Sequence, residues 1–147
     1  EQPLRIILDS HLSINLNSKI LTQGNVLLVY GDDPKNKLNS LKNFRVATLC
    51  LPLSNKKINL HKLMEYLVRI EINNLWIEAG PNLNGSFLEL GLIDELITYM
   101  APILLGGNAS QMFNAPILKS VKNKIHLKLY DVRHVGCDLR IQSRVIR

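Results

Sequence analysis

The residues of this chain whose types and spacing could do chemistry gather in one short segment, residues 75–88. A short apolar run at residues 75–78 is followed by Gly80 and Pro81, and then by a helical pattern. A glycine directly after a strand lets the backbone approach a ligand, and the next helix begins with free N–H groups and a partial positive charge. Pro81 lies near that first turn, where its missing N–H costs nothing. The segment therefore predicts an anion site suited to a pyrophosphate.

Glu78 places a carboxylate in the same segment, at the carboxyl end of the expected strand. That position lies beside the crevice where open α/β sheets bind ligands. A well-made β–α turn with an exposed Glu fits the same residues, because a single glycine turn is weak evidence for a site. The pattern is not Gly-x-Gly-x-x-Gly, which disfavours an ordinary Rossmann site. Spacing alone leaves both interpretations open.

The elements that must position these residues alternate between strands and helices. Strands are expected at residues 4–8, 26–30, 45–51, 75–78, 94–100, 125–132 and 139–145, and helices at 59–72, with Asn59 as N-cap, and at 82–90, ended by Gly91. The first two strands lack polar alternation, which is typical of strands covered on both faces. The last two are joined by a tight connection through Gly136, Cys137 and Asp138. The order predicts an α/β domain whose largely parallel sheet ends in antiparallel strands.

Composition narrows the classes of protein that this chain can belong to. Its 147 residues have the size of one domain, and 46% hydrophobic with 20% charged residues excludes a disordered tail. No apolar run approaches the roughly 18 residues of a membrane span. The two cysteines, Cys50 and Cys137, are too few for a disulfide scaffold, so a reduced cytosolic setting is expected. The chain opens Glu1-Gln2-Pro3 without a methionine, and we expect it to be cut from something longer or processed.

The net charge of +6 fits either background composition, with lysines scattered along the chain, or an anionic partner. The lysines are scattered and aromatic residues make up only 5%, so a phosphorylated small molecule is favoured over nucleic acid. The four histidines show no metal-ligand spacing, and no metal site is expected.

Three separated motifs carry a resemblance to a known family. The run Trp76-Ile77-Glu78-Ala79-Gly80-Pro81-Asn82-Leu83-Asn84-Gly85-Ser86, continuing through residues 91–96 and 101–106, resembles the reductase domain of the bifunctional riboflavin-biosynthesis deaminase–reductase. Residues 3–10 and 133–139 match the same family, and the resemblance spans the whole chain in the right order.

The resemblance implies a dihydrofolate-reductase-like fold, a three-layer α/β sandwich with a mostly parallel mixed sheet and a C-terminal antiparallel hairpin. It implies that residues 1–147 are a single domain, the C-terminal part of the reductase domain. The N-terminal part of that domain and the zinc deaminase domain of the family are absent from this sequence.

The activity implied by the resemblance is NADPH-dependent reduction of the ribosyl group of 5-amino-6-(5-phosphoribosylamino)uracil to ribityl. Glu78 then contacts the substrate, and no catalytic proton donor is assigned. Relatives commonly have Thr where this chain has Asn82, and both are small polar residues. The NADP contacts carried over are Ser10, Gly80, Pro81, Asn82, Leu83, Asn84, Gly85 and Ser86.

The partners implied are a phosphorylated, pyrimidine nucleotide-like small molecule, a deaminase domain or separate deaminase protein, and a second copy in a homodimer. The expected location is the cytoplasm, with no nucleic-acid or membrane partner. Two alternatives stay open: a degenerate, non-catalytic reductase remnant acting as a structural or partner-binding module, and a basic nucleic-acid binder.

Overall fold

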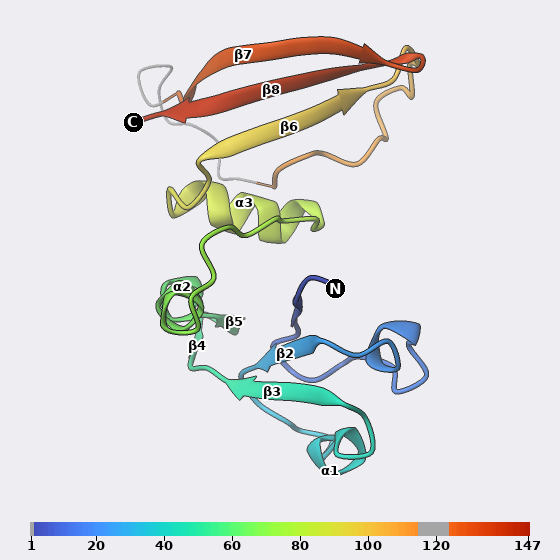
Figure 1. Cartoon of the computed structure of the whole chain (residues 1–147), viewed down its shortest axis with the longest axis vertical. Helices are drawn as coiled ribbons and strands as arrows, with labels where there is room; N and C mark the ends of the chain where they lie inside the picture. The colour runs from blue at the N-terminus through green and yellow to red at the C-terminus, as the bar shows by residue number, and fades with distance from the viewer. Residues whose placement is uncertain (1, 115–123) are drawn as a thin grey trace. The chain divides into compact units, whose positions relative to one another are not determined.

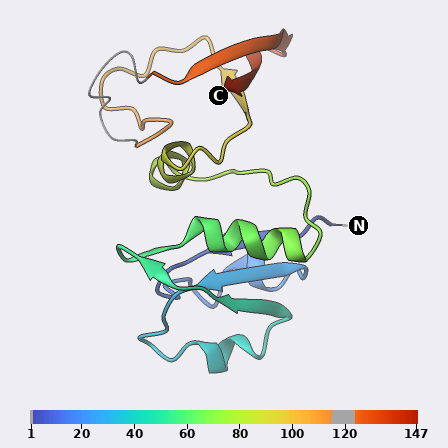
Figure 2. The same ribbon diagram turned by 90° about the vertical axis from the view of Figure 1, so that its left-hand side faces the viewer.

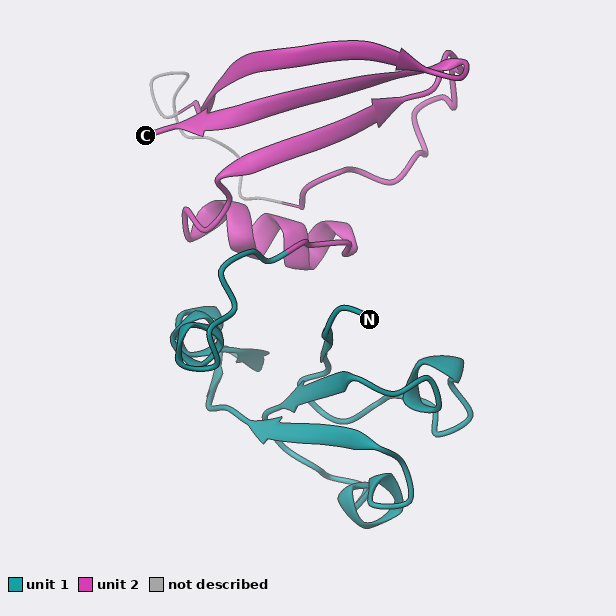
Figure 3. Ribbon diagram, viewed as in Figure 1, with its two compact units in different colours: residues 1–75 teal, residues 76–147 magenta. Residues whose placement is uncertain are grey.

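The computed structural model describes residues 2–114 and 124–147, and the chain divides into two compact units, residues 1–75 and 76–147 (Figure 3). The first unit contains a parallel sheet in the order β1-β2-β3, and β2 and β3 run side by side in Figure 1. The strands are β1 (Arg5–Leu8), β2 (Val26–Tyr30) and β3 (Val46–Cys50). The first four residues of the central strand β2 are all buried, as a continuous apolar run predicts for a strand covered on both faces.

Helical segments cover the strands of the first unit. They are η1 (Lys19–Leu21), α1 (Leu38–Leu41) and α2 (Leu60–Arg69), and in Figures 1 and 2 the strands β2 and β3 lie between α2 and α1. A cluster of four buried leucines packs on one side, namely Leu12, Leu21, Leu28 and Leu41. Helix α2 buries Leu60, Leu63 and Leu67, which recur at helical spacing. Its predicted N-cap is confirmed, because the Asn59 side chain accepts a hydrogen bond from the Lys62 N–H at 3.1 Å.

The described residues of the second unit form one helix and an antiparallel sheet in the order β6-β8-β7. The elements are α3 (Pro81–Glu89), β6 (Glu95–Met100), β7 (His126–Val135) and β8 (Asp138–Ile146). The β7–β8 hairpin turns at Gly136, whose φ of 62° lies in the left-handed region that glycine adopts without strain. Gly91, which follows α3 with a φ of 65°, ends the helix in the same way.

The α/β class and the C-terminal antiparallel hairpin are confirmed, but the strand expected at residues 75–78 is wrong. Residues 72–80 form no regular secondary structure, and the Trp76 side chain is 66% exposed. A strand is held by ladder hydrogen bonds to a neighbour, and within the described residues this run pairs with none. The described strands accordingly fall into separate parallel and antiparallel sheets, with a small hairpin of β4 (Leu53–Ser54) and β5 (Lys57–Ile58) that the sequence did not predict.

In the part of the chain that the structure describes, no helix combines the length and the apolar character needed to cross a bilayer.

Candidate functional site

The N-terminus of α3 presents open backbone. Gly80 is its N-cap, with φ −73° and ψ 169°, and Pro81 is the first helical residue. The first intrahelical bond runs from the Asn84 N–H to the Gly80 carbonyl at 3.1 Å, so the N–H groups of Asn82 and Leu83 precede it and point out of the helix end. A Cβ built on Gly80 would meet no atom within 4 Å. This turn therefore leaves room for an anion in front of unpaired N–H donors.

Several polar side chains predicted to bind cofactor are instead engaged within the protein. The Asn84 Nδ2 donates to the carbonyl of Ala79 at 3.0 Å and to that of Met112 at 3.2 Å. Oδ1 of Asn82 accepts from Nδ2 of Asn114 at 2.7 Å, while the Asn114 N–H donates to the Pro81 carbonyl at 2.8 Å. These side chains fix the shape of the turn, and the backbone is left as the anion donor.

The remaining predicted positions on α3 differ in hydrogen bonding and in burial. The Ser86 hydroxyl donates to the Asn82 carbonyl at 3.0 Å, one turn back along the helix. Gly85 is buried on α3, as is Phe87, while Leu83 is half-buried. Met112 and Asn114 had no signal in the sequence, because they lie 28 and 32 residues from the side chains that they contact.

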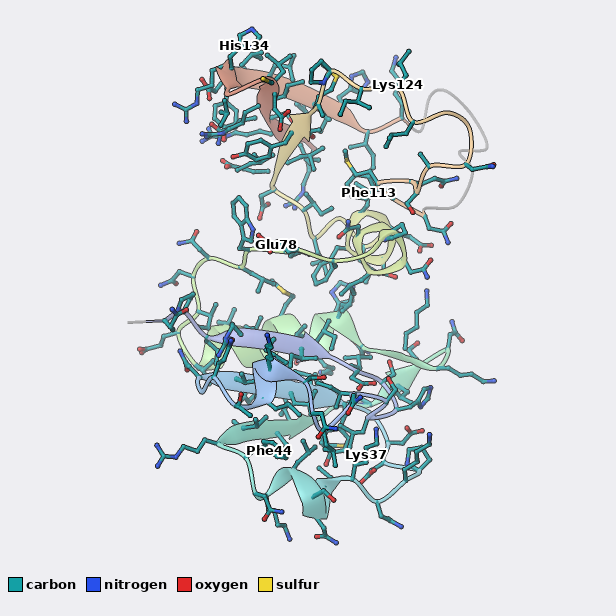
Figure 4. The ribbon with its side chains drawn as sticks, turned by 90° about the vertical axis from the view of Figure 1, so that its right-hand side faces the viewer. Lys37, Phe44, Glu78, Phe113, Lys124 and His134 are labelled. Atoms are coloured by element: carbon teal, nitrogen blue, oxygen red, sulfur yellow. The ribbon has the colours of Figure 1, made fainter. Side chains whose placement is uncertain are left out.

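Glu78 lies on the extended segment that leads into α3, and Phe113 lies near that helix in Figure 4. The carboxylate is exposed, and Trp76 Nε1 donates to its Oε1 at 2.8 Å. Among the described residues Oε2 has no hydrogen-bond partner, so it is free to accept from a ligand. The indole thus orients a carboxylate just ahead of the anion turn. Glu78 does not end a strand as expected, but its place beside Gly80 in the chain is unchanged.

Ser10 belongs to the first compact unit, where it lies two residues after the end of β1. Its carbonyl accepts hydrogen bonds from the N–H groups of Gly31 and Asp32 at 3.0 and 3.1 Å. These bonds place Ser10 at the carboxyl edge of the parallel sheet, the edge at which open α/β sheets bind ligands.

No three His, Cys, Asp or Glu side chains within residues 2–114 and 124–147 are grouped so that they could hold a metal ion.

A model of one protein family matches almost all of this chain. Residues 1–141 match the family model of the RibD C-terminal domain. The chain belongs to this family. The RibD C-terminal domain thus accounts for nearly the whole sequence, including residues 76–86 and the segment around Ser10.

Two relatives show how much of a RibD protein this chain represents. It is 34% identical over 139 residues to the riboflavin biosynthesis protein RibD of Escherichia coli, covering 94% of this chain and 37% of that protein. It is 33% identical over 147 residues to a 5-amino-6-(5-phosphoribosylamino)uracil reductase of Buchnera aphidicola, covering 96% of this chain and 67% of the relative. The chain therefore spans between about a third and two thirds of these relatives.

Solved structures of similar fold include RibD of Acinetobacter baumannii, with a TM-score of 0.82 and 33% identity over 98% of this chain and 38% of that one. The riboflavin biosynthesis reductase Rib7 of Saccharomyces cerevisiae has a TM-score of 0.71 at 21% identity, covering 97% of this chain and 69% of that one, and shares the fold. Reductases of the RibD family imply a nicotinamide cofactor, and the N–H donors at the start of α3 have the chemistry that a pyrophosphate requires.

Proposed function

We propose that this chain serves the NADPH-dependent reduction of 5-amino-6-(5-phosphoribosylamino)uracil, in which the ribosyl group becomes ribityl. The observation that carries the proposal is the open turn at Gly80, which follows an oriented carboxylate at Glu78. Its supporting relative is the Buchnera aphidicola reductase, of which the chain covers 67%. Residues 1–147 act in this proposal as a single functional domain.

The roles of the residues follow from their chemistry. The N–H groups of Asn82 and Leu83 hold the pyrophosphate of the dinucleotide, and the Ser10 hydroxyl donates to a phosphate or ribose oxygen. NADPH, when bound, supplies the hydride. The ribosylamine opens to an imine whose nitrogen takes up a proton, and the carbon of the resulting iminium is the position that would accept the hydride. The Glu78 carboxylate stabilises the positive charge on that nitrogen and orients the sugar hydroxyls.

The experiment that tests the proposal compares two glycines. Gly80→Ser keeps a favourable N-cap but places a side chain in front of the α3 N–H groups, so we expect NADPH affinity to fall at least about tenfold. Gly107→Ser is the matched control, since a Cβ there also meets nothing within 4 Å. Calorimetric titration of NADPH and NADH into the purified protein measures both variants.

The result expected is tight binding of NADPH and weaker binding of NADH by the parent protein, with both affinities lowered in Gly80→Ser and unchanged in Gly107→Ser. Equal losses in the two variants, or no binding of either dinucleotide by the parent protein, would reject the proposal in favour of a non-catalytic module.

The wider setting of the reaction is also a proposal. We infer a cytoplasmic homodimer that works with a deaminase domain or a separate deaminase. The support for the dimer is β7, a strand of ten residues at the edge of the sheet as far as the described residues go, whose exposed apolar side chains include Leu129 at 60% and Val132 at 51%. Leu129→Lys is expected to shift the sedimentation coefficient from dimer to monomer, whereas Val68→Lys on α2, at a 70% exposed position, leaves it unchanged.

A further inference from the structure

The carboxyl ends of β1 and β2 carry a side-chain pair that the proposed reaction leaves unused. Nδ1 of His11 lies 2.6 Å from Oδ1 of Asp32, and the two side chains are 47% and 49% exposed. The hydrogen bonds from Gly31 and Asp32 to the Ser10 carbonyl hold the ends of the two strands side by side. The pair therefore stands beside Ser10 on the ligand-binding edge of a parallel sheet.

The loop that carries His11 is built to hold a fixed position. The Asp9 carboxylate accepts from the Ser13 hydroxyl at 2.9 Å and from the Ile14 N–H at 2.7 Å. Leu12 has a φ of 48° and a fully buried side chain, which anchors the loop in the leucine core. Because Leu12 points inward, the adjacent His11 side chain projects to solvent from a rigid base.

Two other charged groups near this edge, Asp33 and Lys37, bond to the backbone. Asp33 accepts from the N–H groups of Lys37 and Leu38 at 2.7 and 2.9 Å, and the Lys37 ammonium donates to the Ile14 carbonyl at 2.7 Å. Within the described part of the chain, Nε2 of His11 has no hydrogen-bond partner. A carboxylate can only accept, so its bond to Asp32 places a proton on Nδ1 and leaves Nε2 directed outward.

We propose that His11, positioned by Asp32, recognises the 2′-phosphate that distinguishes NADPH from NADH. The inference rests on the proposed function, in that the chain binds a nicotinamide dinucleotide. The protonated imidazole donates from Nε2 to an oxygen of the phosphomonoester, a charge-assisted hydrogen bond that a ribose hydroxyl would not match. Asp32 does not touch the phosphate; it accepts from Nδ1 and so fixes the orientation of the ring.

The test uses fragments that carry only the adenosine end of the cofactor. The ratio of Kd for adenosine 5′-monophosphate to Kd for adenosine 2′,5′-bisphosphate reports recognition of the 2′-phosphate alone. We expect a ratio of at least about ten in the parent protein, the size of one charge-assisted hydrogen bond. His11→Asn, which keeps a donor to Asp32 but lacks Nε2, and His11→Gln, which is neutral, should both bring the ratio to about one. His61→Asn, at an exposed position of α2, should leave it unchanged.

Asp32→Asn separates positioning from direct contact. It should lower the ratio about threefold, because the ring loses the carboxylate that fixes its orientation. A ratio that stays at its parent value in both His11 variants, or that rises in Asp32→Asn, overturns the inference while NADPH binding still supports the proposed function. A parent protein that binds neither NADPH nor NADH overturns the proposed function as well.

Discussion

The two compact units bury their apolar side chains to very different extents. Of the twelve hydrophobic residues that are buried in the described part of the chain, residues 1–75 contain eleven, including the whole run Val26 to Val29. Among the described residues of the second unit, Phe87 alone joins that group, while Leu104 is 100% exposed and Tyr99 57% exposed. Burial of apolar area is the main stabilising contribution to a fold. The first unit thus supplies a core of its own, and the second presents apolar surface and the site residues 78–86.

The largest predicted effect is on kcat and comes from Glu78, the proposed substrate-binding residue of the second unit. Glu78→Gln keeps the shape and removes the charge, so kcat should fall by roughly 10²–10³, the loss typical of one preorganised electrostatic group. NADPH affinity should barely change. Steady-state kinetics beside NADPH titration measure both, with Glu89→Gln on α3 as the control.

A rise in KM at constant kcat would show instead that Glu78 only orients hydroxyls. An unchanged kcat/KM would remove Glu78 from the active site and leave the second unit without its main proposed chemical group.

The next effect concerns the stability of the first unit. Leu28→Ala empties a fully buried position on the central strand and should lower the free energy of unfolding by about 3 kcal/mol. Leu104→Ala in the second unit should change it by less than about 0.5 kcal/mol, because that side chain is fully exposed. Urea denaturation measures both. Similar losses in the two variants would mean that Leu104 is covered in solution.

A smaller effect depends on pH. Burial acts to raise the pKa of Asp9, but hydrogen bonds from Ser13, Ile14 and the His11 backbone outweigh it and hold the pKa below its ordinary 3.8. The ionised carboxylate therefore stabilises the fold above that value, and the stabilisation is lost as pH falls through the lower folded value. Asp9→Asn should lower stability by about 1.5 kcal/mol at pH 7.

Glu95 in the second unit is the carboxylate to compare with Asp9 in the first unit. Arg144 and Tyr130 lower the pKa of Glu95, but its side chain is 45% exposed and solvent screens these interactions, so Glu95→Gln should leave the melting temperature unchanged. As the pH is lowered from 7 to 2, the melting temperature should fall more steeply for the parent protein than for Asp9→Asn. Equal slopes in the two proteins would contradict the stabilising role given to the Asp9 carboxylate.

The smallest effect is local to α2. Asn59→Ala removes the side-chain acceptor of the Lys62 N–H and should cost about 1 kcal/mol. Asn73→Ala, at an exposed position outside any helix or strand, is the control. Thermal unfolding measures the difference, which should vanish if the cap forms only weakly in solution.

What the sequence predicted well are features set by neighbouring residues. The strand Val26–Tyr30 was predicted at its observed bounds, and the Asn59 cap and the glycine that ends α3 follow from local chemistry. The strand at residues 75–78 failed because a strand needs a partner that composition does not reveal. The β4–β5 hairpin was missed because Asn55 and Lys56 adopt φ values of 51° and 63° without a glycine to signal the turn.

The candidate site also combines features that the sequence predicts with features that depend on distant residues. The order of Glu78, Gly80 and Pro81 predicted an anion turn from sequence, and the structure shows an open backbone there. The use of the Asn82 and Asn84 side chains could not be predicted, because their partners Met112 and Asn114 come from a distant part of the chain. Whether the predicted residues bind NADPH remains a prediction for the titrations above.

The hydrogen bonds that join the α3 turn to the Met112 carbonyl and to Asn114 have a consequence for affinity. They order the turn within the folded chain, so a ligand that binds there does not have to immobilise it and loses less free energy to conformational entropy. Preorganisation of this kind slows dissociation more than it speeds association. The residence time of a nucleotide on this protein would then depend on a surface asparagine that never touches it.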